Sequence, residues 1–514
     1  ASGRCTARGA RLPGVSRQYL GSGGRLEGGP ADELIAAGYR YEAAAGPRLA
    51  DGLSTSDLAH VVALTEAEAI PADQAKALLT ALLQLDEIPG DEFPFDPALG
   101  DAFNSREHQL KERAGTVAAG WLSAGRPRRE AFRVGLRLVA RDAARDLHDA
   151  CIDLASALSR LADRHATDLA ADYTYLQPAQ PTRLGHLILA YAYPVLRDAE
   201  RLRTVHAELD LSVAGAGGSA GSRWPLDRTR LAELLGASGV VPHVKDAMWQ
   251  WDPYVQLVAA AATTATHQSE LAQDLEILAS QEFGIASLAD EHSRASALMP
   301  QKRNPYALAV VRATAGTVSG DLAGILVALH TGSARTDHFH VLNTVVPRAM
   351  EEVVASTRLM AAVVDRMTLD ATRAGEAARR GFITAADLSD VLAQEAGLDY
   401  RTAHHVVGRA VKMLVDTGQD ESAITPALLA EAAKASDGID LVVDEALIAR
   451  ALDPDDAADT RMQQGSSAPG ETEAMVAGCE VAVDEARGWS AREAERATRA
   501  HGALRDRARE LAGI

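Results

Sequence analysis

The sequence predicts a mainly α-helical protein built around a central bundle of long helices. Apolar side chains recur at steps of three and four over long stretches, which is the spacing of one buried helix face. Aromatic residues make up only 4% of the chain, while Ala and Leu abound, and period-two alternation typical of strands is weak. At 514 residues the chain exceeds one ordinary core and fits two to four domains.

Three long helices are expected in the centre. The first carries an apolar stripe from Leu184 to Leu202, and Pro194 is expected to kink it. The second stripe runs from Leu257 to Leu278, with Gly284 as its predicted C-cap, and the third helix occupies roughly 309–329. Their Ala-rich faces permit close approach, so we expect them to pack as a bundle.

Clusters of Pro and Gly suggest where the domains meet. The first cluster lies at 123–127 and the second at 379–382. The segment before Pro30 is rich in Gly, Arg and Ser and lacks the apolar stretch of a secretory signal. We therefore predict an N-terminal helical domain (1–127, with a flexible arm over about 1–22), a central helix-bundle domain (128–380) and a small C-terminal helical domain (381–514).

Composition excludes several classes of partner. The net charge of −19 argues against nucleic acid and anionic membranes, but it allows a small anionic substrate held by a local cationic pocket. We expect no apolar run to reach the ~18 residues that a membrane span needs. The three cysteines, Cys5, Cys151 and Cys479, match no metal-ligand spacing, which favours free thiols in a reducing cytoplasm. No metal or cofactor is predicted, and the expected location is cytoplasmic.

The segment from Ser296 to Pro305 is the strongest candidate for chemistry. Its two prolines fix the backbone and disfavour both helix and strand. It places a hydroxyl (Ser296), a cation (Lys302) and an amide (Asn304) on one loop, which are the groups needed to bind a carboxylate and remove a neighbouring proton. A plain turn between two helices with an incidental lysine is the alternative.

Two further polar segments border the helical centre. Gly125 to Glu130 is a cationic turn, and arginine forks suit carboxylates. Tyr173 to Thr182 holds two prolines and two glutamines before a long apolar stripe; alternatively it is only a stiff helix entry with Thr182 as N-cap. One shared site explains three such segments better than chance.

These segments resemble those of the aspartase/fumarase superfamily and, within it, argininosuccinate lyase. The loop is similar to the signature Gly-Ser-Ser-x-Met-Pro-x-Lys-x-Asn-Pro, and Tyr173 to Thr182 resembles Thr-His-Leu-Gln-x-Ala-Gln-Pro-Thr. Gly125 to Glu130 is similar to Gly-Arg-Ser-Arg-Asn-Asp, and further matches extend in order along nearly the whole chain. The resemblance implies a three-domain fold of the aspartase/fumarase type and a homotetramer whose active sites each gather segments from three subunits.

The resemblance also implies β-elimination of fumarate from a substituted succinate. Ser296 matches the base, and Lys302 would help to stabilise the dianion formed when the proton leaves. Tyr175 occupies the general-acid position. The predicted site therefore comprises catalytic Ser296, Tyr175 and Lys302, with substrate ligands Thr174, Gln177, Asn304, Arg126, Arg128, Arg129, Met299, His338 and Arg335.

Several departures from the family pattern lie within the site. The family's histidine is Tyr175 here, and the glutamate that partners it is Ala309, so both halves of one acid relay are absent. Trp249 and Trp251 stand where the family has Ser and Arg, which makes that end of the pocket less polar. Tyr175, His338 and His340 are candidates for the acid, unless a good leaving group needs none.

The resulting hypothesis is an argininosuccinate lyase-like carbon–nitrogen lyase that releases fumarate from an N-substituted aspartate other than argininosuccinate, in specialised metabolism. One alternative is a catalytically silent paralogue with a binding or structural role, favoured by the missing acid pair. Another is a lyase that works in the addition direction, because one transition state serves both directions.

Overall fold

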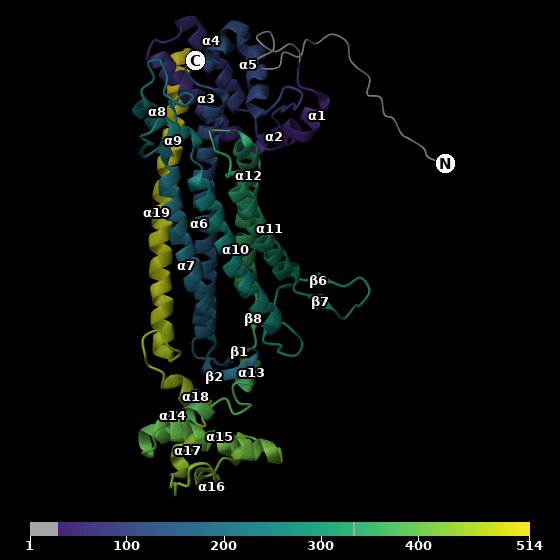
Figure 1. Cartoon of the computed structure of the whole chain (residues 1–514), viewed down its shortest axis with the longest axis vertical. Helices are drawn as coiled ribbons and strands as arrows, with labels where there is room; N and C mark the ends of the chain where they lie inside the picture. The colour runs from purple at the N-terminus through teal and green to yellow at the C-terminus, as the bar shows by residue number, and fades with distance from the viewer. Residues whose placement is uncertain (1–28, 333–334) are drawn as a thin grey trace, which may run out of the picture.

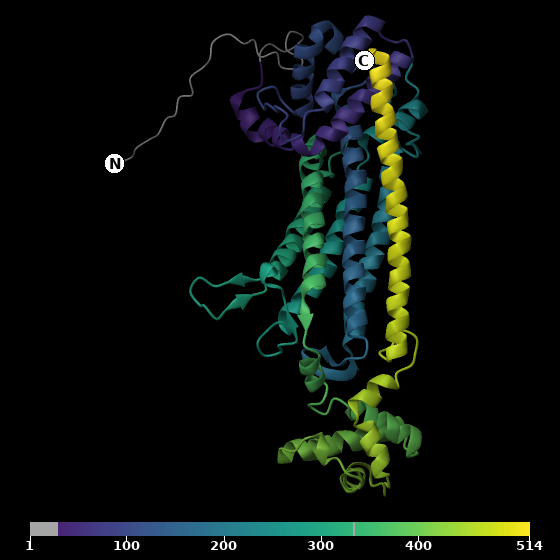
Figure 2. The same cartoon turned by 180° about the vertical axis from the view of Figure 1, so that it is seen from behind.

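The protein is dominated by a bundle of long helices, as the sequence predicts. A computed structural model describes residues 29–332 and 335–514; the predicted arm over about 1–22 lies outside these residues. Figures 1 and 2 show the long helices running side by side along the longest axis. They are α6 (Arg128–Arg164), α7 (Leu184–Leu209), α10 (Asp252–Leu278), α11 (Tyr306–Ala328), α12 (Asp337–Arg366) and α19 (Pro469–Ala512).

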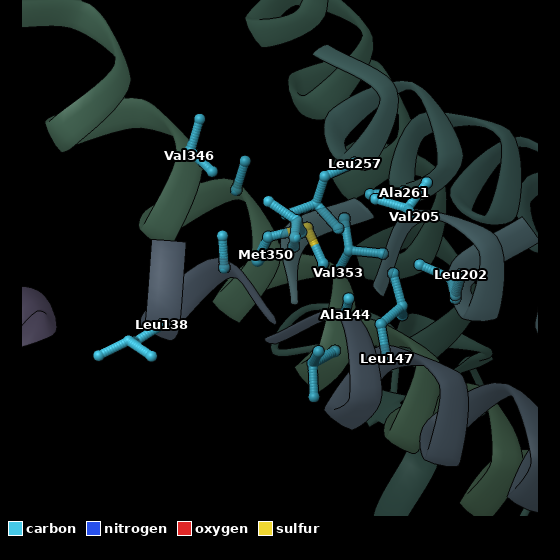
Figure 3. Close-up of a cluster of buried hydrophobic side chains, with 14 of the residues drawn as sticks. Leu138, Ala144, Leu147, Leu202, Val205, Leu257, Ala261, Val346, Met350 and Val353 are labelled. Atoms are coloured by element: carbon cyan, nitrogen blue, oxygen red, sulfur yellow. The ribbon is translucent and has the colours of Figure 1, made fainter. Parts of the chain in front are cut away.

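Apolar stripes on these helices meet in a common core. Figure 3 shows this core in the middle of the bundle, where α6, α7, α10 and α12 contribute buried side chains. The predicted stripe of α7 is buried, including Leu202, and Pro194 lies inside the continuous helix. The labelled core residues are Leu138, Ala144, Leu147, Leu202, Val205, Leu257, Ala261, Val346, Met350 and Val353.

An N-terminal group of helices covers one end of the bundle. It comprises α1 (Asp32–Leu34), the π-helix η1 (Ile35–Tyr39), α2 (Arg40–Ala44), α3 (Gly46–Glu66), α4 (Ala72–Asp86), α5 (Ala102–Ala119) and the 3₁₀ turn η2 (Gly120–Ser123). Helix α3 crosses α6 so closely that a Cβ on Gly52 would stand 2.3 Å from the carbonyl oxygen of Gly135. Glycine is therefore required at this crossing, and the two cores are continuous.

A smaller helical unit at the other end has its own core. It contains α14 (Ala385–Glu395), α15 (Tyr400–Thr417), η4 (Glu421–Ala423), α16 (Pro426–Asp437), α17 (Glu445–Ala451) and α18 (Pro454–Asp459). Helix α19 instead runs back along the bundle to the N-terminal helices (Figure 1), and its apolar residues join the main core. We therefore propose to end the C-terminal unit near residue 468, in place of the predicted 514.

Strands occur only as short pairs among the described residues. β1 (Leu169–Thr174) and β2 (Gln177–Arg183) form an antiparallel hairpin, and β6 (Arg294–Ala295) pairs with β7 (Arg303–Asn304). The prediction that the Ser296–Pro305 loop suits no strand is thus wrong at Arg303 and Asn304. The remaining pairs are β3 (Leu211–Ser212) with β4 (Gly239–Val240) and β5 (Ala286–Ser287) with β8 (Thr368–Leu369). Short helices α8 (Arg228–Leu234), α9 (Val244–Trp249), η3 (Asp290–His292) and α13 (Ala371–Ala377) complete the chain.

Three local predictions need correction. Thr182 is not the N-cap of α7, because it lies in β2 and Arg183 holds the cap position without a side-chain bond. Gly284 does not cap α10, which ends at Leu278; its φ of +62° serves a later turn. The expectation that no segment is long and apolar enough to cross a membrane is also wrong, since α11 meets that test by length and composition and only 22% of its most apolar window is buried.

Candidate active site

The three predicted segments lie in three different places on one chain. The cationic turn starts α6 beside the N-terminal helices, and the β1–β2 hairpin lies at the opposite end of the bundle (Figure 1). The β6–β7 loop projects from the side of the bundle in both views (Figures 1 and 2). A single chain therefore does not bring the predicted site residues together.

The β6–β7 loop pre-organises the hydroxyl of Ser296. Its Oγ accepts hydrogen bonds from the backbone N–H groups of Leu298 and Met299, at 3.3 Å and 3.0 Å. Two N–H donors aimed at one oxygen favour its deprotonated form, because both interactions strengthen when the oxygen becomes negative. This arrangement is what a serine base requires.

The remaining predicted residues of the loop lie close to Ser296. The backbone N–H of Ser296 bonds to the carbonyl of Lys302 at 3.3 Å, and the N–H of Lys302 bonds to the carbonyl of Met299 at 3.0 Å. The exposed Lys302 ammonium has no ion-pair partner within 29–332 and 335–514. The Asn304 amide donates to the carbonyl of Arg294 at 3.0 Å, which leaves its oxygen available.

The tip of the β1–β2 hairpin holds the second group of predicted residues. Thr174 pairs with Gln177, so Tyr175 and Leu176 form the two-residue turn. Both turn residues have positive φ, +53° and +57°, a conformation that strains non-glycine side chains. Tyr175 is 99% exposed in the single chain. An apolar cavity of about 460 Å³ lies beneath the tip.

The cationic turn borders a polar cavity of about 870 Å³ at the other end of the bundle. Arg128 and Arg129 both line it, as do Trp249 of α9 and the start of α12. Arg128 pairs with the buried carboxylate of Asp101 at 3.0 Å, and the guanidinium of Arg129 stands 4.1 Å from the centroid of the Trp249 ring. Burial raises the pKa of Asp101 to about 6, although Arg128 opposes the shift.

Arg126 does not behave as a free anion ligand. Its side chain is buried and bonds to Asp57 at 2.6 Å and to the backbone carbonyl and hydroxyl of Ser56 at 3.2 Å. A buried guanidinium with its own carboxylate holds the turn against α3. These bonds favour a structural role for Arg126, and its predicted contact with substrate stays a prediction.

His338 lies beneath the cavity and does not line it. The ring is buried, 4.5 Å from Trp251 and 6.3 Å from Trp249 between centroids, and its Nε2 has no partner among the described residues. Burial, aided by Arg133 and Arg129, lowers the pKa of His338 to about 4. The lowered pKa favours the neutral imidazole at pH 7, and the predicted role of His338 as a substrate ligand stays a prediction.

His340 faces the cavity from the first turn of α12. Its Nδ1 lies 2.8 Å from Oε1 of Glu42 in α2, and both residues line the cavity. Sequence reasoning included His340 among the candidate acids but missed Glu42, since nothing near Glu42 resembles a motif. Arg335, which was predicted to bind substrate, is exposed beside the start of α12 and lies outside the lining.

The described residues, 29–332 and 335–514, contain no cluster of three His, Cys, Asp or Glu side chains that could hold a metal ion. Cys151 and Cys479 are buried free thiols, while Cys5 lies outside the described residues.

The fold and the loop define a lyase. A family profile described as "Lyase" matches residues 52–320, and one described as "Argininosuccinate lyase C-terminal" matches 382–458. The argininosuccinate lyase of Methanoculleus marisnigri is 33% identical over 423 residues, which cover 82% of this chain and 85% of the relative. Argininosuccinate lyase 1 of Mesorhizobium japonicum is 34% identical over 400 residues, covering 76% and 84%.

Solved structures agree with this assignment. The crystal structure of EDDS lyase in complex with formate superposes with a TM-score of 0.83 at 26% identity, covering 98% of this chain and 99% of that chain. An EDDS lyase variant with bound fumarate gives the same values. The chain belongs to the argininosuccinate lyase-like branch of the aspartase/fumarase superfamily. The predicted fold class and the assignment to carbon–nitrogen lyases of this type are confirmed.

Proposed function

We propose that this enzyme releases fumarate by β-elimination from an N-substituted aspartate other than argininosuccinate. The observation that carries the proposal is the Ser296 hydroxyl, which two backbone N–H groups hold in a form suited to deprotonation. The ammonium of Lys302, which has no ion-pair partner among residues 29–332 and 335–514, stands on the same loop. The EDDS lyase variant that binds fumarate has the same fold and supports the product.

In this mechanism each loop group has one task. Ser296 removes the proton next to a carboxylate of the succinate moiety. Lys302 and Asn304 stabilise the negative charge that develops on that carboxylate, and stabilisation of this kind commonly accounts for most of the rate acceleration. Thr174 and Gln177, at the base of the hairpin turn, bind the substrate carboxylates. Collapse of the carbanion forms the double bond of fumarate and expels the nitrogen.

A homotetramer with shared active sites completes the proposal. The β6–β7 loop, the β1–β2 hairpin and the start of α6 lie at separate places on one chain (Figures 1 and 2), which supports sites completed by segments of other subunits. Helix α11 also leaves Val310, Leu326 and Val327 exposed, and these apolar residues suit burial against other subunits. Partner helices are a simpler cover for α11 than a lipid bilayer, because the β6–β7 loop just before it carries the exposed cations Lys302 and Arg303.

The proposed substrate differs from argininosuccinate because of the cavity. Trp249 stacks on Arg129, and Arg128 is paired with Asp101, so the cationic turn has less free charge than its sequence suggests. A cytoplasmic role in specialised metabolism is the setting that we propose for this altered pocket.

A panel of N-substituted aspartates, including argininosuccinate, tests the proposal through the ultraviolet absorbance of fumarate. We expect turnover of at least one panel member, and its loss in Ser296→Ala. Ser293→Ala is the matched control, because this nearby hydroxyl bonds only to the carbonyl of Ala289 at 3.0 Å among described groups. Absence of turnover across a broad panel by a folded tetramer would contradict the proposal.

The second candidate function is that of a catalytically silent paralogue, which binds a ligand of this class but does not convert it. The observation that favours it is the absence of the acid pair at Tyr175 and Ala309. Tight binding of fumarate, together with no turnover of any member of the substrate panel, would favour the silent paralogue. Incubation of fumarate with amines, followed by chromatography of the product, would identify an enzyme that works in the addition direction.

A further inference from the structure

A histidine–carboxylate pair lies inside the polar cavity, away from the position where the family pattern has one. His340 projects from the start of α12 and Glu42 from α2, with Nδ1 and Oε1 2.8 Å apart. The carboxylate is largely buried, at 16% side-chain exposure, while the imidazole is 44% exposed. A buried carboxylate thus fixes one nitrogen of a ring whose other nitrogen is open to the cavity.

The charged groups around this pair leave the His340 ring available to a substrate. Asp101 is near enough to Glu42 to have its pKa raised by it, but Asp101 has its own partner in Arg128. Arg129 is engaged by the ring of Trp249. Asp337 lines the same cavity from the start of α12. The facing groups are thus Asp101 before α5, Arg128 and Arg129 of α6, and Asp337 of α12, with Glu42 closest to His340.

We propose that His340 is the general acid that protonates the departing nitrogen, and that Glu42 positions its ring. This inference rests on the proposed fumarate-releasing function. It accounts for the loss of the usual acid pair at Tyr175 and Ala309, because His340 and Glu42 supply a second pair elsewhere in the chain. Glu42 accepts from Nδ1–H, which orients Nε2 toward the leaving group.

The proton and electron movements balance without a further reactant. Ser296 takes the proton from carbon, the resulting electron pair forms the C=C bond, and the C–N bond breaks. The nitrogen keeps the pair from the broken bond and receives the proton of the His340 imidazolium at Nε2. The products are fumarate, the free amine and neutral His340, and exchange with solvent returns Ser296 and His340 to their starting protonation.

Neither of the other candidates offers the same geometry. His338 is two residues earlier on α12, so its side chain falls on the buried side of the helix, against Trp251. Tyr175 stands at the tip of the hairpin and has no carboxylate partner among the described residues to position it.

The test compares His340→Gln and Glu42→Gln with His405→Gln. His405 is the matched control because it also pairs with a carboxylate, Asp437, at 3.7 Å, but lies on α15 in the separate C-terminal unit. With a substrate whose leaving amine is strongly basic, we expect His340→Gln to lower kcat by about 10²–10⁴-fold, Glu42→Gln by less, and His405→Gln not at all. With a weakly basic leaving group, the loss in His340→Gln should shrink toward none.

Two outcomes separate this inference from the proposed function. If the wild type releases fumarate and His340→Gln retains its rate with basic leaving groups, the acid role is overturned and the function stands. A uniform loss in His340→Gln for all leaving groups also overturns it, because a structural defect does not depend on leaving-group basicity. Absence of wild-type turnover would overturn both.

Discussion

The guanidinium carbon of Arg133 lies 3.5 Å from the centroid of the Trp251 ring, and both side chains are buried. Arg133 also donates to the backbone carbonyls of Ala247 and Gln250, which ties α6 to α9 and the turn after it. Burial lowers the pKa of this arginine to about 10, but it remains charged at neutral pH. The pair packs beside His338, whose ring centroid lies 4.5 Å from that of Trp251 and 6.3 Å from that of Trp249.

Trp251→Ala should therefore lower the unfolding free energy by about 3–5 kcal/mol, the range for truncating a buried indole. Trp251→Phe should cost less, because a phenyl ring still faces the cation. Urea denaturation followed by circular dichroism measures both. Equal losses in the two variants would contradict the cation–ring contribution.

Protonation of two buried histidines should contribute a loss of stability between about pH 6.5 and pH 4, opposed by carboxyl groups with raised pKa values such as Asp101. Burial lowers the pKa of His338 and of His206 from 6.5 to about 4 in the folded chain. The unfolded chain therefore binds protons at a pH where the folded chain does not, so stability is full above 6.5 and falls toward 4.

Each of these histidines should steepen the slope of unfolding free energy against pH by up to about 1.4 kcal/mol per pH unit within that window. His338→Gln should flatten the slope, whereas His405→Gln, at an exposed site, should leave it unchanged. Denaturation midpoints collected across the window provide the comparison.

Asp101→Asn should leave stability at pH 7 unchanged or higher. Burial disfavours the Asp101 carboxylate and raises its pKa to about 6, so ionisation at pH 7 costs more in the folded chain than in the unfolded chain. An asparagine oxygen can still accept the N-cap bond from the N–H of Asn104, now at 3.2 Å. A loss above about 1 kcal/mol in thermal or urea unfolding would show that the ion pair with Arg128 stabilises the fold.

Leu176→Gly should separate stability from activity. Leu176 has a positive φ and is 56% exposed, so glycine removes strain of about 1 kcal/mol and little buried surface. The variant should be as stable or more stable, but slower in fumarate release because the hairpin tip loses its fixed shape. Val442→Gly, at an exposed site without positive φ, should show no stability gain.

Mixed tetramers test the sharing of active sites. Ser296→Ala and Gln177→Ala each alter a different segment of the proposed site, so neither homotetramer should be active. Dissociating and reassembling the two together should restore part of the activity, because some sites then receive both intact segments. If mass spectrometry shows that the tetramers contain both variants and no activity returns, the sharing of active sites between subunits is contradicted.

Features with local signals could be predicted from the sequence. The stripes of α7 and α10 follow from spacing and residue type alone. The role of Ser296 as the base comes from the family resemblance and stays a prediction. The partner of Arg126 could not, because Asp57 lies 69 residues earlier and only the crossing of α3 and α6 brings them together. The burial of His338 and the exposure of His340 likewise depend on which side of α12 meets the bundle.

The return of α19 was missed for a related reason. Its composition is that of an ordinary amphipathic helix, and nothing in its residues tells which core its apolar face joins. Long-range packing decides that, and the packing places Val476 and Leu504 in the main core. Glu42 was missed for the same reason, because only its contact with His340 in the folded chain marks it as a candidate.

The base of the hairpin is held to the small C-terminal unit by ion pairs. Arg183 at the end of β2 pairs with Asp455 and Asp459, and Arg461 donates to the carbonyl of Pro181 in the same strand. The chain enters this unit after α13 and leaves it into α19, so the unit is joined to the bundle at two points. Because these contacts hold the strand that carries Gln177, we expect the packing of the small unit to fix the position of the hairpin.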